Sequence, residues 1–355
     1  MSLMDHLTAR IQTDGPMSVA DYMGDCLLHP QYGYYTTRDP LGAQGDFTTA
    51  PEISQMFGEL LGLALAQSWL DQGSPAPFTL AELGPGRGTL MADLLRATRG
   101  VPGFHTAMRI RLIEASPALR AAQAKALQDY APEWLDSAAD LPDQPLFLIA
   151  NEFFDALPIR QFLREGGGWS EKRIGLKDGA LSFGRTPPAP QPALDHRLAD
   201  TRDGDLVELC EPAGPVTAAI AARIATRGGA ALIVDYGDWR ALGDTLQALR
   251  AHEPADPLQA PGEADLTAHV DFEALAMAAK TNGCAFTRLT PQGVFLERLG
   301  ITDRARALAA PLQGEGLETL IAAHRRLTHP EEMGNLFKVL GLYPSQAAPP
   351  PGLNT

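Results

Sequence analysis

The chain has 355 residues, of which 45% are hydrophobic and 20% are charged, as is ordinary for a globular α/β protein of one large or two smaller domains. Its formal net charge of −14 argues against nucleic acid as a partner, because affinity for phosphates comes largely from Lys and Arg. No apolar run of about 18 residues could span a membrane, and the cysteines Cys26, Cys210 and Cys284 are too far apart to predict a disulfide framework or a zinc cluster. We therefore expect a soluble protein of a reducing compartment.

The first 75 residues are predicted to form an N-terminal helical cap and a loop that covers a cofactor. Helical spacing runs over residues 3–28, and Ser18 is a candidate N-cap for a second helix within this segment. The turn-rich, aromatic residues 29–37 are interpreted as a loop. Because the N-terminus has no basic start followed by an apolar core, we expect a bacterial-type cytoplasmic protein.

A further helix is predicted from residue 51 to about residue 70. Pro51 suits a first helical turn, and the apolar residues that follow it share one face. Thr49 and Glu52 lie at its start. Either Thr49 caps this helix and Glu52 complements the helix dipole, or both belong to a loop that folds over the cofactor.

The most informative motif is Glu82-Leu-Gly-Pro-Gly-Arg-Gly-Thr89. Residues 78–82 predict a short buried strand, the alternate glycines predict a tight turn, and residues 89–99 predict a helix. Glycine lets the backbone lie against a ligand, and the N–H groups at a helix start can bind anionic groups. We therefore expect a nucleotide-like ligand here, bound by Glu82, Gly84, Pro85, Gly86, Gly88 and Thr89.

The spacing of the glycines distinguishes between nucleotides. The dinucleotide fingerprint G-x-G-x-x-G/A fails, because its last position is occupied by Thr89 or Met91. A P-loop requires Lys after its glycines, and no Lys precedes Lys125. An acid followed by G-x-G-x-G is typical of S-adenosylmethionine-dependent methyltransferases with a Rossmann-like sheet. The alternative is a structural glycine turn in another α/β unit.

Residues 108–114 predict a second strand that ends in an acid, Glu114. In doubly wound sheets an acid at this position accepts hydrogen bonds from ribose hydroxyls, which is the role predicted for Glu114. The alternative is an exposed acid beside a turn. Asp140 and Leu141 fall in the loop expected after the third strand and are candidates for an adenine pocket.

The apolar residues 145–150 predict a central parallel strand. It is followed by Asn151-Glu-Phe-Phe-Asp-Ala-Leu-Pro158, and the carboxyl end of such a strand is where open α/β sheets bind ligands. Glu152 and Asp155 are three residues apart, so a turn can bring their carboxylates together. Alternatively, Asn151 and Asp155 only cap and start a helix.

Beyond this motif the pattern predicts insertions at about 159–205, 238–270 and 291–334. The first contains a hairpin, the second an extended surface loop over residues 243–269, and the third helices. Between the first two lie an alanine-rich helix and a buried strand that ends in Asp235 and Tyr236. Residues 343–355 are predicted to be a disordered, Pro-rich tail. No Gly-x-Ser-x-Gly elbow, His-Glu-x-x-His motif or His/Cys cluster supports a hydrolase or a metal site.

Four motifs resemble the MidA family, which groups bacterial proteins with a mitochondrial complex I assembly factor. They lie at 45–59, 82–89, 151–158 and 262–272, and the resemblance covers roughly residues 3–342. It implies a Rossmann-like, seven-stranded class I methyltransferase sheet over residues 76–342, with the insertions above, and S-adenosyl-L-methionine as the cofactor. The mitochondrial members, expected in the matrix, are similar to an arginine methyltransferase that symmetrically dimethylates the 49 kDa subunit of complex I.

The resemblance therefore implies a protein substrate, related to a complex I subunit, and allows a homodimer; neither nucleic acid nor membrane insertion is expected. Because an arginine guanidinium stays protonated, carboxylates hold it best. Glu152 is then expected to orient the guanidinium, Asp155 or Asn151 to assist, and Glu52 to close the site from the N-terminal side.

Two other classes remain open. One is an assembly chaperone that binds S-adenosylmethionine without essential turnover. The other is a methyltransferase for a small molecule or a nucleic-acid base, since Asn-Glu-Phe-Phe loosely resembles the Asn-Pro-Pro-Phe loop of base methylases. The Glu at its second position and the acidic net charge speak against a nucleic-acid substrate.

Overall fold

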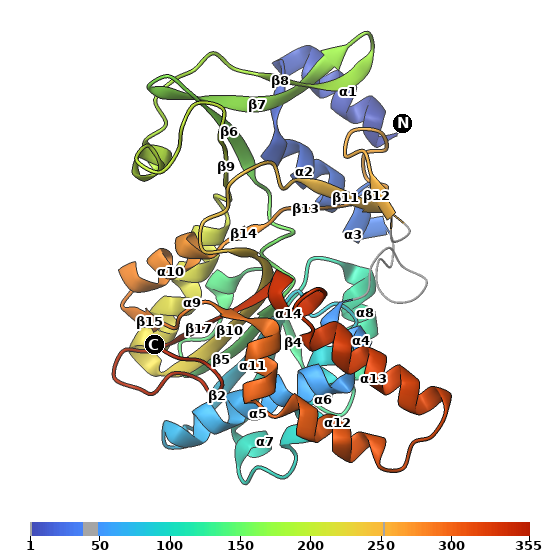
Figure 1. The fold of residues 1–355 in the computed structure, drawn as a ribbon, viewed down its shortest axis with the longest axis vertical. Coiled ribbons are helices and arrows are strands. Elements are labelled where there is room, and N and C mark those ends of the chain that lie inside the picture. Colours follow the sequence, from blue (N-terminus) through green and yellow to red (C-terminus); the bar gives the residue numbers. More distant parts are fainter. Residues whose placement is uncertain (1, 38–48, 251–252) are drawn as a thin grey trace. The chain divides into compact units, whose positions relative to one another are not determined.

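The computed structural model describes residues 2–37, 49–250 and 253–355, so the part of the first motif before Thr49 lies outside the described residues. The chain divides into two compact units, each assembled from separate segments (Figure 1). Unit 1 comprises Met1–Phe47, Asp155–Ala213 and Arg240–Asp271. Unit 2 comprises Thr48–Phe154, Gly214–Trp239 and Phe272–Thr355.

Unit 2 is built on a mixed sheet with the strand order β15-β17-β10-β5-β2-β3-β4. Strands β10, β5, β2, β3 and β4 run parallel, whereas β17 is antiparallel to both of its neighbours. The bounds are β2 Phe78–Leu83, β3 Met108–Ile113, β4 Glu133–Leu135, β5 Leu146–Asn151, β10 Gly229–Asp238, β15 Cys284–Phe286 and β17 Phe337–Pro344, and the short β16 Thr290–Pro291 also pairs with β17. The predicted seven-stranded α/β sheet is confirmed.

Strands β2 and β5 form the centre of this sheet because their residues suit burial on both faces. All six residues of each strand are buried, as a covered parallel sheet requires. The register pairs Leu83 with Ile113 on one side and with Ala150 on the other, and it pairs Asn151 with Val234. The carboxyl ends of β2, β3, β5 and β10 therefore meet at one edge of the sheet.

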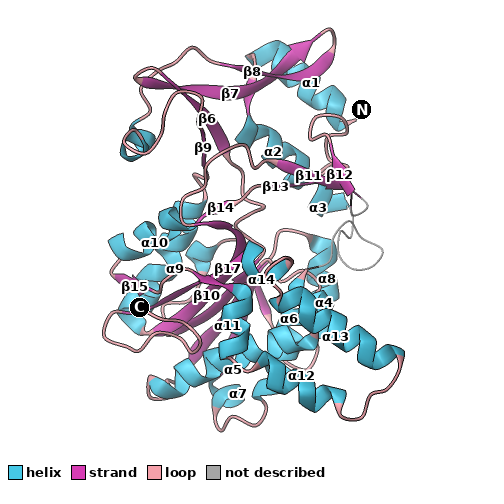
Figure 2. Ribbon diagram, in the orientation of Figure 1, coloured by secondary structure: helices cyan, strands magenta, loops and turns pink. Residues whose placement is uncertain are grey.

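Helices surround the sheet of unit 2 (Figure 2). Their bounds are α4 Ala50–Ile53, α5 Gln55–Asp71, α6 Thr89–Thr98, α7 Phe104–Ala107, α8 Pro117–Ala126, η1 Ala138–Asp140, α9 Ala213–Arg227, α10 Phe272–Thr281, α11 Gln292–Arg298, α12 Ile301–Ala309, α13 Glu315–Thr328 and α14 Met333–Leu336. The prediction of a single helix from residue 51 to about 70 was wrong in one respect. Ser54 is extended, with φ −161° and ψ 137°, and its Oγ accepts a hydrogen bond from Met56 N, so it separates α4 from α5 as the cap of α5.

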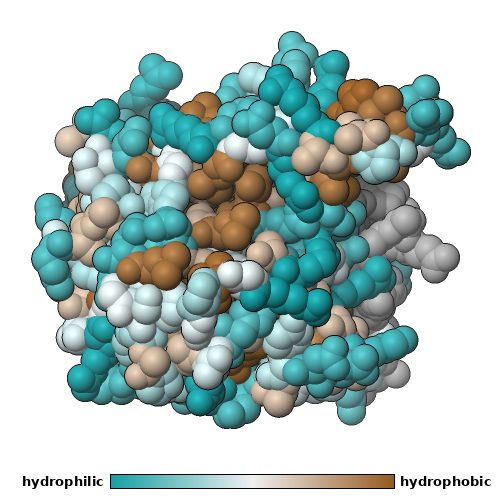
Figure 3. All heavy atoms as spheres, turned by 90° about the horizontal axis from the view of Figure 1, so that it is seen from below, coloured by the Kyte–Doolittle hydropathy of each residue, from teal (hydrophilic) through white to brown (hydrophobic). Residues whose placement is uncertain are grey.

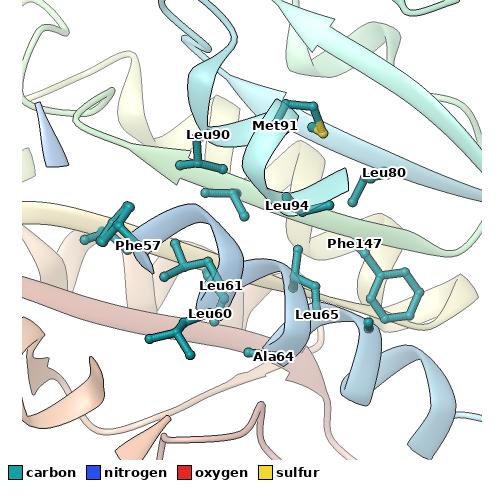
Figure 4. Packing of buried hydrophobic residues seen from close by; sticks show 14 of the residues in the cluster. Phe57, Leu60, Leu61, Ala64, Leu65, Leu80, Leu90, Met91, Leu94 and Phe147 are labelled. Atoms are coloured by element: carbon teal, nitrogen blue, oxygen red, sulfur yellow. The ribbon is translucent and has the colours of Figure 1, made fainter. Parts of the chain in front are cut away.

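Helices α5 and α6 approach closely over the core of unit 2. Two glycines one turn apart on α5 allow this contact: a Cβ at Gly62 would lie 2.6 Å from Leu94 Cγ, and a Cβ at Gly58 would lie 2.9 Å from Leu90 O. Figure 4 shows the side chains that fill the surrounding core, with Phe57, Leu60, Leu61, Ala64 and Leu65 from α5, Leu90, Met91 and Leu94 from α6, and Leu80 and Phe147 from the sheet. This packing fixes α6, whose first residue follows the glycine turn.

Unit 1 has its own sheets and its own hydrophobic core. One antiparallel sheet has the order β1-β7-β6-β9, with β8 paired to β7, and a second has the order β12-β11-β13. The bounds are α1 Leu3–Asp14, β1 Met17–Ser18, α2 Val19–Leu28, α3 Tyr34–Thr37, β6 Arg160–Glu165, β7 Gly168–Lys177, β8 Ala180–Arg185, η2 Pro192–Arg197, β9 Leu206–Leu209, β11 Gln247–Arg250, β12 Glu253–Ala255, β13 Asp265–Thr267 and β14 Val270–Asp271. Ser18 caps α2 as predicted, since its Oγ accepts a hydrogen bond from Asp21 N at 3.0 Å.

Three sequence predictions about irregular segments need correction. The segment 29–37 is not a loop throughout, because it ends in the short helix α3. The described part of 243–269 is not an extended surface loop: it contributes β11, β12 and β13, and Ala248 and Leu266 are buried with residues of α1 and α2. The C-terminal residues are not a disordered tail either. Strand β17 extends through Pro344, Leu353 is buried in the core of unit 2, and Arg288 N donates to Asn354 O at 2.8 Å. In segments 243–269 and 343–355, the few apolar residues that become buried were not recognised among the Pro and polar residues around them.

Within 2–37, 49–250 and 253–355, none of the helices has the length and apolar character needed to cross a bilayer. On the face shown in Figure 3, hydrophobic side chains lie in separate groups among hydrophilic ones.

Candidate functional site

The glycine turn follows β2 at the carboxyl edge of the sheet of unit 2. Gly84, Gly86 and Gly88 have φ angles of +60°, +55° and +84°, a region that glycine occupies far more easily than residues with a Cβ. A Cβ at Gly84 would also lie only 3.1 Å from the Phe153 ring. Gly88 N donates to the carbonyl of Pro85 at 2.8 Å, and α6 then begins at Thr89. The predicted strand, turn and helix are therefore present.

Glu82 is a buried acid at the end of β2, only 3% exposed. Its Oε2 has no hydrogen-bond partner among the described residues. Burial, together with the nearby charge of Glu114, raises the pKa of Glu82 to about 8. Because buried polar atoms are normally paired, this oxygen suits a ligand that brings a hydrogen-bond donor, best of all a cationic one.

Glu114 directly follows β3 and is buried, so it is not an exposed acid beside a turn. Its Oε1 accepts a hydrogen bond from Ser116 N at 2.8 Å, and its Oε2 accepts one from Gln123 Nε2 at 3.1 Å. Burial raises the pKa of Glu114, and these two donors oppose that shift. Sequence reasoning missed Gln123, although one signal was present: it follows Leu119 by four residues, and these two are the buried residues of α8.

Asp140 and Leu141, the adenine-pocket candidates, lie after β4. Asp140 ends η1 and is exposed, whereas Leu141 is buried and its carbonyl accepts a hydrogen bond from Arg223 Nε at 2.8 Å. Their role remains a prediction.

Glu152 follows β5 in a strained conformation. Its φ is +51°, a conformation that costs a non-glycine residue about 1–3 kcal/mol and is enriched at functional sites. Glu152 N donates to Val234 O at 2.9 Å, and its Oε1 accepts hydrogen bonds from Ala50 N at 3.1 Å and from Asn151 Nδ2 at 3.0 Å. No helix begins within 151–158, so the capping alternative for Asn151 and Asp155 is wrong.

Asp235 holds the backbone that follows Glu152. It is fully buried in β10, and its Oδ2 accepts hydrogen bonds from Phe153 N at 3.2 Å and from Phe154 N at 3.0 Å. Its Oδ1 accepts one from Tyr236 N at 2.9 Å. Sequence reasoning placed Asp235 only at the end of a strand, because the parallel pairing of β10 with β5 is not visible in the sequence.

Glu52 lies in α4 and contacts the first residue of α6. Its Oε1 accepts a hydrogen bond from Thr89 Oγ1 at 2.5 Å. Thr49 occupies the N-cap position of α4, but its side chain makes no capping hydrogen bond. Since Ala50 N also contacts Glu152, segment 49–53 brings Glu52, Thr89 and Glu152 together at one edge of unit 2.

Asp155 is the first residue of the second segment of unit 1. It is buried, and its carbonyl accepts a hydrogen bond from Ala268 N at 3.0 Å. Asp155 thus belongs to unit 1, whereas Asn151 and Glu152 belong to unit 2, and its catalytic role remains a prediction.

Comparison with known proteins identifies relatives along almost the whole chain. A family model described as "Putative S-adenosyl-L-methionine-dependent methyltransferase" matches residues 60–290. The mitochondrial protein arginine methyltransferase NDUFAF7 of Danio rerio is 38% identical over 95% of this chain and 86% of its own length. The Drosophila melanogaster homolog is 37% identical over 98% of this chain and 86% of its own length.

A solved structure supports the same relationship. The crystal structure of a "likely methyl transferase" from Burkholderia thailandensis, bound to S-adenosyl-homocysteine, matches with a TM-score of 0.83 and 29% identity. The match covers 99% of this chain and 92% of that chain. The glycine turn and the unpartnered buried oxygen of Glu82 fit such a ligand, which carries an α-amino group. The chain therefore belongs to the MidA/NDUFAF7 family, described as S-adenosylmethionine-dependent methyltransferases, with a class I fold and S-adenosylmethionine as the cofactor.

Proposed function

We propose that this protein is an arginine N-methyltransferase that acts on a protein, a respiratory complex I subunit of the 49 kDa type or a relative of it. The observation that carries the proposal is Glu152, a carboxylate held in a strained conformation at the carboxyl edge of the sheet. The relatives' description as protein arginine methyltransferases supports the class of acceptor.

The cofactor is assigned to the glycine turn and its two acids. Glu82 Oε2 would accept from the α-ammonium group, Glu114 would accept from the two ribose hydroxyls, and the turn of Gly84, Gly86 and Gly88 would lie against the ligand without intervening side chains. Asp140 and Leu141 are assigned to the adenine. When bound, S-adenosylmethionine supplies an electrophilic methyl group on a sulfonium.

The acceptor arginine is assigned to Glu152. A guanidinium presents paired N–H donors in one plane, which a carboxylate receives in bidentate geometry. Hydrogen bonds from Ala50 N and Asn151 Nδ2 fix the carboxylate of Glu152 before the acceptor arrives, so little ordering remains at the moment of reaction. Asn151 Oδ1, which has no hydrogen-bond partner in the part of the chain that the structure describes, offers a second acceptor beside it.

The same groups would serve the proton that leaves the acceptor nitrogen. The carboxylate of Glu152 carries the negative charge that stabilises the guanidinium during transfer, and it can accept the released proton. Asp155 is assigned an assisting role with Asn151. Glu52, linked to Thr89 at the start of α6, is assigned to closing the site.

Replacement of Glu152 by Gln tests the catalytic assignment. We expect Glu152→Gln to lower turnover by at least ~100-fold, because the charge that holds and deprotonates the guanidinium is lost. Affinity for S-adenosylhomocysteine, measured by calorimetry, should remain close to that of the wild type, since Glu152 is not assigned to the cofactor. The exposed Glu253→Gln serves as the control and should retain full turnover. Unchanged methylation by Glu152→Gln would refute the assignment.

The acceptor can be identified by mass spectrometry of proteins from cells with and without this chain. We expect loss of arginine methylation on a complex I subunit in its absence, restored by the wild type and not by Glu152→Gln. If Glu152→Gln restored assembly of the partner without methylation, the assembly-chaperone alternative would be correct instead. Loss of methylation only on a small molecule would instead favour a small-molecule methyltransferase.

A further inference from the structure

Gln123 lies where the glycine turn, the acid after β3 and the outer strand β4 meet. It belongs to α8 and is completely buried. Its Nε2 donates to Gly86 O at 2.7 Å and to Glu114 Oε2 at 3.1 Å, and its Oε1 accepts from Trp134 Nε1 at 2.7 Å. Two of these three bonds join side chains, which is the least frequent class of hydrogen bond in proteins, so the arrangement is a specific one.

The chemistry of its partners fixes the orientation of this amide. An indole N–H can only donate, whereas a carbonyl oxygen and a carboxylate can only accept. If the amide were flipped, its NH₂ would face the indole N–H of Trp134, and its oxygen would face Gly86 O and Glu114 Oε2. Trp134 therefore determines that both N–H groups of Gln123 point toward the turn and the acid.

The consequence is a link of fixed length between two parts of the cofactor site. One nitrogen atom bonds both the carbonyl of the middle glycine and one oxygen of Glu114, while Ser116 N holds the other oxygen. Helix α8 also lies against the turn, because a Cβ at Gly88 would be 3.5 Å from the Cα of Gln123. Gln123 thus bonds the turn and Glu114 at the same time.

We propose that Gln123 is a positioning residue of the cofactor site, which sets the spacing between the glycine turn and Glu114, and that Trp134 fixes the orientation of its amide. This inference rests on the proposed contact of Glu114 with the ribose. It goes beyond that contact by assigning a role to two residues that act through Glu114 and Gly86.

Replacement of Gln123 by Met retains the length of the side chain and removes all three hydrogen bonds. We expect Gln123→Met to weaken binding of S-adenosylhomocysteine ~10-fold to ~100-fold in calorimetry, because Glu114 and the turn lose their common donor. The control is Gln128→Met, the same change at an exposed position shortly after α8, which should bind like the wild type. Trp134→Phe leaves α8 unchanged but lets the amide of Gln123 flip, so a smaller loss, ~3-fold to ~10-fold, is expected.

NMR spectroscopy reports directly on the hydrogen bond from Trp134 Nε1 to Gln123 Oε1. In an amide-proton NMR spectrum the indole N–H signal of Trp134 is identified by its disappearance in Trp134→Phe. It should shift in Gln123→Met and stay in place in Gln128→Met. A signal that does not respond to Gln123→Met would show that the bond from Trp134 to Gln123 is absent and would overturn the role of Trp134.

The pH dependence of binding distinguishes positioning through Glu114 from a general loss of order around the proposed cofactor site. Glu114 is faced by Glu82 of β2 and by Arg120 of α8, as well as by the donors Ser116 and Gln123. Without the donor of Gln123 the pKa of Glu114 rises further, so binding by Gln123→Met should begin to weaken at a higher pH than in the wild type as the pH is lowered. A loss of affinity of equal size at all pH values would contradict positioning through Glu114.

Glu114→Gln distinguishes failure of this inference from failure of the assignment beneath it. Unchanged affinity in Glu114→Gln would refute the ribose contact. Weakened affinity in Glu114→Gln with unchanged affinity in Gln123→Met would refute the positioning role alone. The affinity of the double variant Glu114→Gln/Gln123→Met should lie within ~3-fold of that of the weaker single variant, because both changes remove one shared contact. A loss of affinity equal to the product of the two single losses would overturn the proposal. If Gln123→Met fails to fold, calorimetry of Trp134→Phe carries the test, and an affinity equal to that of the wild type would overturn the proposal.

Discussion

Single residues give the proposed cofactor site its buried carboxyl groups. Glu82 and Glu114 lie at neighbouring strand ends, and burial raises the pKa of both. A folded protein that contains such a group binds a proton more tightly than its unfolded chain does, so the group lowers stability wherever the unfolded chain has already released the proton. Ligand-free protein carries this cost, and the α-ammonium group that is proposed to lie beside Glu82 would relieve it.

Glu82 provides a prediction about stability and pH. Its pKa rises from 4.5 in an ordinary carboxyl to about 8 in the fold, so its unfavourable contribution grows as pH increases through this window. We therefore expect Glu82→Gln to raise the Tm of the ligand-free protein more at pH 8 than at pH 5. The exposed Glu315→Gln is the control in the same unit and should show a constant difference. Thermal unfolding at pH 5 and pH 8 measures both differences in Tm. An equal effect of Glu82→Gln at the two pH values would contradict a buried Glu82 carboxyl whose Oε2 has no hydrogen-bond partner.

The candidate site residues that the sequence could predict are those that lie in a local motif or directly follow a predicted strand. Gly86 and Glu82 share one motif, and Glu114 follows the next strand, so local patterns were enough to propose them. Gln123 and Asp235 escaped prediction because their contacts join distant segments: Gln123 bonds Gly86, 37 positions away, and Asp235 bonds Phe154, 81 positions away. No alternation or spacing within one element reports such pairs.

At the scale of elements, Gly58 and Gly62 of α5 matter most, because the close contact that they allow fixes α6 next to the glycine turn. Gly58 and Gly62 let α5 contact the backbone of α6, and α6 begins at the residue that follows the glycine turn. Sequence predicted α6 correctly and one long helix in place of α4 and α5. The break at Ser54 was not predicted because it depends on a local cap, whose Oγ bond to Met56 N competes with continued helix.

Gly62→Ala tests this contact between helices. The new Cβ would lie 2.6 Å from Leu94 Cγ and 2.9 Å from Leu94 Cα, so the backbone of α6 must shift, and we expect a loss of ~1–3 kcal/mol in the free energy of unfolding. Gly24→Ala in the interior of α2, where a Cβ meets nothing within 4 Å, is the control and should stabilise by ~0.5–1 kcal/mol. Chemical denaturation measures both, and an increase in stability for Gly62→Ala would show that the helices are not in close contact.

At the scale of the whole molecule, two compact units are interleaved along the sequence. The parallel sheet of unit 2 was predictable because its strands are apolar runs separated by helical patterns. The assembly of Met1–Phe47, Asp155–Ala213 and Arg240–Asp271 into one unit was not, because short antiparallel strands such as β11 and β13 pair over long separations and carry little pattern of their own.

Transfer of a labelled methyl group to arginine is the most direct test of the proposed function. Purified protein is incubated with S-adenosylmethionine carrying a deuterated methyl group and with a complex I subunit of the 49 kDa type, and the products are fragmented by tandem mass spectrometry. We predict deuterated methyl groups on arginine guanidino nitrogens with the wild type and their absence with Glu152→Gln. Label on another residue type, or no label on protein although S-adenosylhomocysteine binds, would contradict arginine methylation at Glu152.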